Sequence, residues 1–426
     1  MNKDSFLKAS VSRRDFIKTS VVASLAAAIP RNLGAYVAGS DMIRIGMIGC
    51  GGRGTGAAID CLNAANGVEV VAMADLFQDH LEASLRKLKE AHSDKIKVTP
   101  DHSFTGFDAY QKLLACPDVN LVVLATAPHF RPLHLKAAVE AGKHIFMEKP
   151  VAVDPVGIRS VIVSSELAKQ KGLAIVAGTQ RRHQAQYIEL MKRLQDGAIG
   201  EVIGGECYWN QGELWVKKKE PEWSDMEWQC RNWLYFTWLS GDHIVEQHVH
   251  NIDVINWAFG TLPIKALGLG GRQVRIGLEY GNIYDHFAVE FEYPNGARVL
   301  SMCRQIPGCS DRIEERVIGT KGSAFSSGEI KGDKSWKYEG PNPDPYVQEQ
   351  ADLIASIRRG EPLNEGRRIA ESTLCAIMGR MSAYTGRALS WDWVMNSSKL
   401  DLTPPKYEFG DLPVEPVAMP GLTHLV

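Results

Sequence analysis

The 426-residue chain lacks most of the features that mark specialised classes of protein. Its net charge is only −2, which gives no reason to expect nucleic acid or an anionic membrane as a partner. Beyond the N-terminal segment it has no apolar run long enough to span a bilayer, and it has no internal repeat or low-complexity segment. With an ordinary hydrophobic content of 45%, the length indicates a globular protein of two domains and a tail.

The eight cysteines form neither a C-x-x-C pair nor a zinc-binding spacing. We therefore expect no metal site built from them, and we expect most of them to lie in or near the core. Only Cys303 and Cys309 are close enough in sequence to suggest a disulfide.

Residues 1–40 have the pattern of an export signal. The segment 12–18, with Arg13 and Arg14 at its centre, resembles the twin-arginine motif, and a modestly apolar stretch and small residues near Ala38 follow it. No lipobox cysteine is present, so no lipid anchor is expected. These features predict a twin-arginine signal peptide, passage of the folded chain through the twin-arginine translocase, and a periplasmic location.

Three glycines between a short apolar strand and a helix give the strongest signal in the chain. Gly49, Gly51 and Gly54 fit the pattern G-x-G-x-x-G between a strand expected at 43–48 and a helix expected at 55–65. In that setting the glycines allow a tight turn, a close approach of the backbone to a pyrophosphate and close packing of helix on strand. The loop residues expected to contact a dinucleotide are Gly49, Gly51, Gly52, Arg53 and Gly54.

The acid that follows this motif bears on which dinucleotide is bound. A second strand, expected at 69–74, ends at Asp75. An acid at this distance from the glycines can bind both ribose hydroxyls and repels a 2′-phosphate, so NAD is favoured over NADP. Arg53 would soften that preference, because its positive charge suits a phosphate.

The order of expected strands and helices divides the chain. Strands and helices alternate as far as about residue 180, which is typical of a doubly wound α/β domain. Strands of alternating polarity follow and indicate a mostly antiparallel sheet. The expected parts are a signal peptide at 1–40, a Rossmann-like domain at 41–180, an α+β domain at 181–340, helices that pack back on the core at 341–395, and a Pro-rich extended tail at 396–426 that packs on a neighbour or is left loose.

Two further motifs complete a recognisable set: Glu148-Lys149-Pro150, and Glu246-x-x-x-His250-x-x-Asp253. With the glycines, they resemble the Gfo/Idh/MocA family of nicotinamide-dependent sugar and polyol oxidoreductases, over residues 42 to about 395. The resemblance implies a Rossmann-like domain, a second α+β domain with an open-faced, mostly antiparallel sheet, and an active site between them. It also implies a homodimer or homotetramer built through the sheets.

The resemblance assigns roles to three residues. Lys149 follows a strand end, so it lies at the edge of the sheet where ligands bind, and the family implies that it hydrogen-bonds the reacting hydroxyl and relays its proton. His250 corresponds to the acid/base partner. Glu246, where the family more usually has Asp, is expected to orient a substrate hydroxyl. The spacing of Glu246 and His250 predicts that both lie on one helix face.

Other candidate residues surround these three. Thr126 and His129 resemble the family's loop over the nicotinamide half of the cofactor, and Glu148 is a further expected cofactor contact.

Among the clustered tryptophans of 209–238, most are expected to fill a loop core or an interface, although aromatic faces also stack on sugars. His248 is expected to be a structural histidine and not a metal ligand. The expected substrate contacts, besides Glu246 and His250, are Arg181, Arg182, His183, Trp209, Trp233 and His243.

Three functions are compatible with this pattern. The first is a dehydrogenase that oxidises a secondary hydroxyl of a sugar, glycoside or polyol. The second is a redox-cycling glycosidase, in which oxidation at carbon 3, elimination, hydration and re-reduction use the same nicotinamide. The third is a non-catalytic carbohydrate-binding protein. Because the periplasm supplies no free NAD, we expect the cofactor to be tightly bound.

Overall fold

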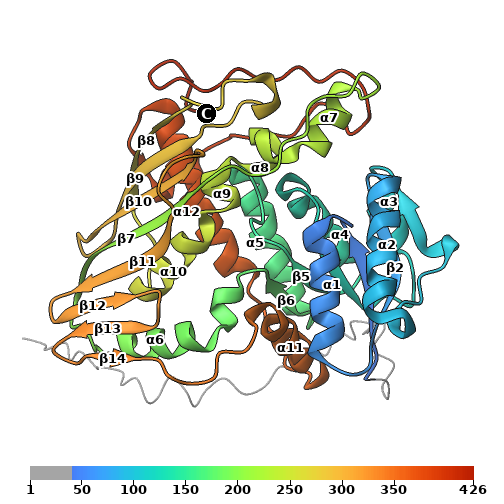
Figure 1. The fold of residues 1–426 in the computed structure, drawn as a ribbon, viewed down its shortest axis with the longest axis horizontal. Helices are drawn as coiled ribbons and strands as arrows, with labels where there is room; N and C mark the ends of the chain where they lie inside the picture. Colours follow the sequence, from blue (N-terminus) through green and yellow to red (C-terminus); the bar gives the residue numbers. More distant parts are fainter. Residues whose placement is uncertain (1–40) are drawn as a thin grey trace, which may run out of the picture.

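The computed structural model describes residues 41–426, so the export signal expected at 1–40 lies outside the described residues. Within the described part of the chain, a six-stranded sheet and a nine-stranded sheet stand on either side of a layer of helices (Figure 1). The six-stranded sheet is parallel throughout. Its strands, in spatial order, are β3 (Ser103–Thr105), β2 (Val68–Asp75), β1 (Ile43–Ile48), β4 (Leu121–Leu124), β5 (His144–Met147) and β6 (Ile175–Ala177).

Both faces of the parallel sheet are covered, which explains why its strands are almost continuously apolar. On β1, Ile45 and Met47 belong to one hydrophobic cluster and Ile48 to another, on opposite faces. This is the expected doubly wound arrangement. One face is covered by α1 (Gly52–Ala64), α2 (Gln78–His92) and α11 (Pro345–Arg358). The other is covered by α3 (Ala109–Leu114), α4 (Arg131–Glu140), α5 (Pro155–Gln170) and α12 (Gly366–Thr385).

The nine-stranded sheet is antiparallel except for the pairing of β7 with β10. It is the mixed, mostly antiparallel sheet that the alternating polarity of the sequence predicts. Its strands, in spatial order, are β14 (Trp336–Lys337), β13 (Glu329–Gly332), β12 (Gly322–Phe325), β11 (Arg312–Gly319), β7 (Val202–Gln211), β10 (Arg298–Gln305), β9 (His286–Glu292), β8 (Lys265–Gly271) and β15 (Leu389–Ser390).

Helices cover only one face of this second sheet. Along β10, Val299 and Cys303 are buried against the helices, whereas Leu300 and Met302 alternate with them and are exposed. The remaining helices are α6 (Ala185–Gln195), α7 (Asp225–Arg231), α8 (Thr237–Ser240), α9 (His243–Glu246), α10 (Val249–Phe259) and α13 (Trp391–Asn396). Short 3₁₀ turns are η1 (Ser93–Lys95), η2 (Pro100–His102), η3 (Pro128–Phe130), η4 (Gln180–His183), η5 (Trp233–Tyr235) and η6 (Leu278–Tyr280).

The tail at 396–426 was expected to pack on a neighbour or to be left loose. In the structure it packs on its own chain. It runs along the top of the molecule in Figure 1 and reaches α7. The amide of Leu402 donates to Asp154 at 2.9 Å, and the amide of Leu412 donates to Asp225 at 3.2 Å. The tail is therefore held to both halves of the molecule.

Two other observations complete the fold. All eight cysteines are free thiols and only Cys309 is exposed, so the disulfide suggested for Cys303 and Cys309 is not formed. Among the helices of the described residues, none combines the length and the apolar character that a membrane crossing requires.

Candidate active site

The glycine loop joins β1 to α1 and has the geometry of an anion cradle. A Cβ at Gly49, where φ is +99°, would lie 2.5 Å from the Thr126 amide, and one at Gly54 would lie 2.0 Å from the Gly49 carbonyl. Larger residues therefore do not fit at either place. A Cβ at Gly51 or Gly52 would meet nothing within 4 Å, and α1 begins there without a side-chain cap. The positive end of the helix thus faces free space that a pyrophosphate fits.

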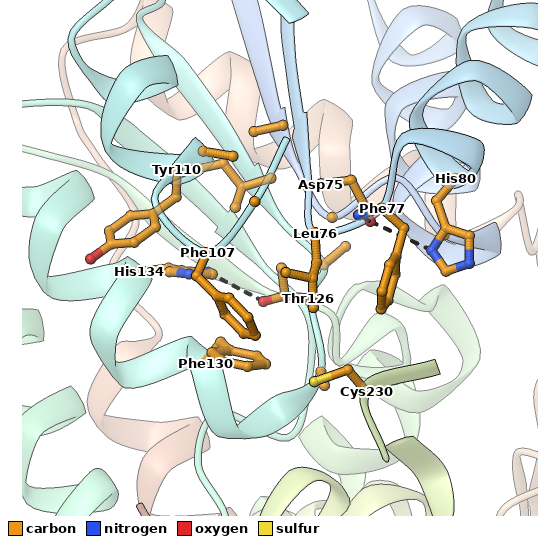
Figure 2. Close-up of a pocket in the computed structure, with 18 of the residues that line it drawn as sticks. Asp75, Leu76, Phe77, His80, Phe107, Tyr110, Thr126, Phe130, His134 and Cys230 are labelled. Carbon is orange, nitrogen blue, oxygen red and sulfur yellow. Dashed lines mark hydrogen bonds and ion pairs between the residues drawn. The ribbon is translucent and has the colours of Figure 1, made fainter. Parts of the chain in front are cut away.

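Asp75 ends β2 beside this loop. One carboxylate oxygen accepts from the Cys50 amide at 2.6 Å, and the other accepts from the Phe77 amide at 2.9 Å. His80 lies 3.5 Å from the second oxygen. Asp75 and Thr126 line one cavity of about 140 Å³, and aromatic side chains such as Phe77, Phe107 and Phe130 form part of its other walls (Figure 2). The arrangement suits a ribose diol next to a flat base.

The loop after β4 is held in place by a buried arginine. Arg131 donates to the carbonyl of Thr126 at 2.8 Å and to the carbonyl of Glu148 at 2.9 Å, so it ties the loop to the end of β5. His134 lies 3.3 Å from the Thr126 hydroxyl (Figure 2). His129 pairs with the Tyr407 hydroxyl at 2.9 Å, and burial lowers the pKa of His129 to about 4.

Lys149 meets Glu246 across the interface between the two halves of the molecule. Its ammonium donates to the backbone carbonyl of Glu246 at 2.7 Å and lies 3.4 Å from the Glu246 carboxylate and 3.3 Å from the Gln247 side chain. The expected single helix is broken here, since α9 ends at Glu246 and α10 begins at Val249. The amide of His250 donates to the Gln247 carbonyl instead, which leaves the Glu246 carbonyl for Lys149.

His250 lies at the first turn of α10, next to an aromatic wall. The Trp209 indole stacks on it with ring centres 5.7 Å apart, and the Arg181 guanidinium lies 5.5 Å from the same indole. Burial, together with the positive charges of Lys149 and Arg181, holds the pKa of His250 well below its usual range. The imidazole is therefore neutral, with one ring nitrogen unprotonated. Its Nδ1 is buried without a hydrogen-bond partner.

Several residues expected at the substrate have partners within the protein. Arg182 makes two bonds to Asp253, at 2.7 and 2.9 Å. His183 lies between Asp352 at 2.6 Å and Glu365 at 3.5 Å; although burial lowers its pKa, these two carboxylates raise it to about 9. Arg182 and His183 thus join η4 to the helices behind it, where ion pairs hold them.

Arg181, His243 and Trp233 also have partners that the sequence does not reveal. Arg181 forms an ion pair with the buried Glu315. His243 bonds to the Asp242 carboxylate at 3.0 Å and packs edge-on against a ring of the second sheet. Trp233 lines the cavity of Asp75, so the structure places it away from Trp209. The expected structural role of His248 agrees with its bond of 2.7 Å to Ser301.

Arg53 pairs with carboxylates and does not line the cavity that holds Asp75. Its guanidinium bonds to Glu148 at 2.6 Å and to Asp60 at 3.2 Å, and it lies 4.9 Å from the ring of Tyr346. Asp75 has no part in this cluster. Arg53 therefore offers no counter-charge beside Asp75 that would soften the preference for NAD.

Sequence reasoning missed two residues of this site. Gln247 contacts Lys149 only because the helix breaks after Glu246, and Arg131 resembles any polar residue at a helix start. Neither has a spacing that distinguishes it. Within residues 41–426, no three side chains among His, Cys, Asp and Glu converge in a way that could hold a metal ion.

A dinucleotide cradle, a strand-end lysine and a neutral histidine on the facing helix define a nicotinamide-type oxidoreductase architecture. Comparison with family models is consistent with this. Residues 43–179 match the model described as oxidoreductase family, NAD-binding Rossmann fold, and residues 191–373 match the C-terminal alpha/beta domain of the same family. The chain belongs to the Gfo/Idh/MocA oxidoreductase family.

Curated relatives are distant. Inositol 2-dehydrogenase of Acidothermus cellulolyticus is 26% identical over 232 residues, which are 54% of this chain and 58% of that protein. A glycosyl hydrolase family 109 protein of Shewanella amazonensis is 27% identical over 228 residues, 50% of this chain and 48% of that protein. The chain thus spans about half the length of the curated relatives it matches.

Solved structures agree in fold. The scyllo-inositol dehydrogenase from Lactobacillus casei with bound NAD(H) and scyllo-inositol has a TM-score of 0.63 at 16% identity, covering 82% of this chain and 99% of that one. The aldose-aldose oxidoreductase from Caulobacter crescentus has a TM-score of 0.64 at 18% identity, with the same coverage. At this identity the likeness concerns the fold.

Proposed function

We propose that the protein uses NAD to oxidise a secondary hydroxyl of a sugar, glycoside or polyol. The observation that carries the proposal is the contact of Lys149 with Glu246 at the carboxyl edge of the parallel sheet, beside the dinucleotide cradle, with His250 near enough for the Lys149 charge to lower its pKa. Ligands of doubly wound sheets bind at that edge. Relatives named as inositol dehydrogenases support a polyol or sugar as the substrate class.

In this proposal each residue acts on the substrate hydroxyl. The Lys149 ammonium, fixed by the Glu246 carbonyl, points a remaining N–H at the hydroxyl oxygen and stabilises negative charge there. The neutral imidazole of His250 takes the hydroxyl proton. Bound NAD supplies the hydride acceptor. The Glu246 carboxylate accepts a hydrogen bond from a neighbouring hydroxyl and fixes the orientation of the ring.

A second candidate, a redox-cycling glycosidase, is favoured by the relatives named as glycosyl hydrolase family 109 proteins. Transient oxidation at carbon 3 acidifies the proton at carbon 2, the aglycone leaves by elimination, water adds, and the hydride returns. Lys149 and His250 serve both schemes, because both begin by removing a hydroxyl proton. A non-catalytic carbohydrate-binding role is less well supported, since it would not require these two residues to meet.

One assay separates these functions. The mature protein, incubated with nitrophenyl and natural glycosides, should form either NADH or a keto sugar if it is a dehydrogenase. Absorbance at the nicotinamide wavelength and product release are followed together. Aglycone release without net NADH would instead identify the redox-cycling glycosidase. Sugar binding without NADH formation and without product release would identify a binding protein.

The chain should bind NAD at least about tenfold more tightly than NADP, because a 2′-phosphate would lie against the Asp75 carboxylate. Asp75→Asn removes the charge with little change of shape, so it should reduce this ratio mainly by improving NADP binding. Titration calorimetry with each dinucleotide measures the ratio. Asp118→Asn, an exposed substitution in the same domain, is the control; an unchanged ratio in Asp75→Asn would refute the assignment of Asp75.

We further propose that the enzyme is exported by the twin-arginine pathway and works in the periplasm with a tightly held NAD. The arginine pair at 13–14 and its apolar follower support this location. The twin-arginine translocase carries folded proteins, so the cofactor is loaded before export. No free NAD is then available for exchange, and tight binding follows as a requirement.

A homodimer or homotetramer is also part of this proposal, with a second copy of the chain on the open face of the nine-stranded sheet. Four exposed apolar side chains on this face support it. Leu267 and Leu269 lie on β8, Leu300 and Met302 lie on β10, and β9 runs between these two strands. Exposed apolar side chains on an uncovered sheet face are typical of a subunit interface.

A further inference from the structure

The cavity that holds Asp75 is built from three separate parts of the chain. Its floor comes from the parallel-sheet domain. Cys230 and Trp233 approach from α7 and η5 of the second half, and Tyr407 comes from the C-terminal tail. Figure 2 shows Cys230 on the side of the cavity opposite Asp75. The site for the adenosine half of a dinucleotide is therefore closed by elements outside the Rossmann-like domain.

The tail is anchored over this cavity by contacts on both sides. The hydroxyl of Tyr407 pairs with His129 at 2.9 Å. Phe409 stacks on Phe77, with ring centres 6.0 Å apart and planes 12° apart, and it lies 5.3 Å from Phe107. Each of these three partners belongs to the parallel-sheet domain. The tail thus crosses the domain at the edge of the dinucleotide site.

The same stretch of tail is fastened to α7. The Met226 amide donates to the carbonyl of Gly410 at 3.1 Å, and the Gln229 side chain donates to the carbonyl of Leu412 at 2.6 Å. On its other side, α7 reaches α2, because Arg231 forms an ion pair with Asp79 at 3.0 Å. We call residues 407–412 and α7 together the cover.

Phe77 is where the cover meets the cofactor site. It is buried, it lies two residues after Asp75 at the end of β2, and it lines the cavity. The Arg231 guanidinium lies 3.9 Å from the centre of its ring, and Phe409 stacks on the same ring. One aromatic side chain of the cavity wall is therefore held by both parts of the cover.

The size of the cavity shows what the cover does. At about 140 Å³ it is smaller than the ~300–1,000 Å³ of ordinary small-molecule sites, so it fits part of a dinucleotide and not the whole. Because Tyr407 and Cys230 form part of its wall, the cover narrows the way out for the part that it holds. Parting of the cover breaks the Phe409 stack and the Tyr407 bond at the same time, because both lie on the same stretch of tail.

We propose that Tyr407, Phe409 and Arg231 are part of the NAD site and that the cover retains the bound dinucleotide by slowing its release. This rests on the proposed use of NAD, and it adds residues from the tail and α7 to a site otherwise made by the Rossmann-like domain. The retained group is recognised by its flat base and ribose diol, which lie under the cover. A cofactor that travels with an exported enzyme needs such a device.

The test is the release rate of NADH from the full chain. Protein loaded with NADH is mixed with excess NAD, and the loss of bound NADH fluorescence is followed. Phe409→Ala should release NADH about tenfold faster, and Tyr407→Phe, which keeps the ring and removes only the bond to His129, should release it a few times faster. Leu422→Ala, an exposed change in the same tail, should release it at the wild-type rate.

Each outcome decides the matter. Equal NADH release rates in wild type, Phe409→Ala and Tyr407→Phe would refute the proposed role of the cover and leave the proposed function intact. Equal acceleration by Leu422→Ala would also overturn it, because the tail would then act through general stability. A wild-type protein that binds no NADH would refute the proposed function itself. If Phe409→Ala does not fold, as judged by thermal unfolding, the rate of Tyr407→Phe decides alone.

Discussion

Replacing Lys149 with methionine should lower turnover by about 10²–10³ while NAD stays bound, because the change removes the ammonium that stabilises negative charge on the hydroxyl oxygen and keeps the length of the side chain. Lys149 is only 11% exposed, and its ammonium is positioned by the Glu246 carbonyl and the Gln247 side chain. The dinucleotide cradle is made by backbone and by Asp75, so it does not depend on this amine. Turnover and NADH binding are measured on the same preparation.

Two matched variants sharpen this test. Lys112→Met changes a surface lysine of the same domain and should leave turnover unchanged. Lys149→Arg keeps the positive charge, but its planar guanidinium is too wide for the position that the ammonium takes at the carbonyl of Glu246, so turnover should still be lost. Normal turnover in Lys149→Met would refute the assignment of this site.

The parts of the fold that depend on local pattern were predictable. A Cβ at Gly49 or Gly54 would collide with neighbouring backbone atoms. The same close packing recurs in every strand–loop–helix unit of this kind. Continuous apolar strands predicted a sheet covered on both faces. The position of Lys149 followed from the strand end before it, since the carboxyl ends of parallel strands meet at one edge.

Pairings over long sequence separations were not predictable. Nothing near Arg181 shows that its partner is Glu315, and nothing near His183 shows that Asp352 and Glu365 face it. The sequence therefore placed three basic residues beside the cleft without showing which of them binds substrate and which is an ion-pair partner. In the structure, carboxylates from distant elements pair with all three, which offsets the cost of burying their charges.

The break between α9 and α10 has the same origin. Helical spacing alone places Glu246 and His250 on one face, because it assumes that each amide bonds four residues back. The structure instead gives the Glu246 carbonyl to Lys149, almost a hundred residues earlier in the chain. A tertiary hydrogen bond thus replaces a local one at the residue where the chemistry is proposed.

Asp253→Asn should destabilise the protein by about 3–5 kcal/mol, because it removes the counter-charge of Arg182 and leaves Arg368 with Glu365 alone. Asp253 is 1% exposed, and it accepts two bonds from Arg182, weaker ones from Arg368 at 3.2 and 3.3 Å, and one from the Ser372 hydroxyl at 2.8 Å. Although burial favours the neutral acid, these two guanidiniums hold the pKa of Asp253 far below its usual range.

The sign of the pH effect follows from that lowered pKa. A carboxylate whose pKa is lower in the folded than in the unfolded protein stabilises the folded state at pH values above its ordinary pKa of about 3.9. This stabilisation is lost as the pH falls below that value. Urea unfolding from neutral pH to pH 3 should therefore show a steeper loss of stability in wild type than in Asp253→Asn, while the exposed control Asp333→Asn follows wild type. A variant as stable as wild type but inactive would mean that Asp253 acts on the substrate and not as the anchor of Arg182.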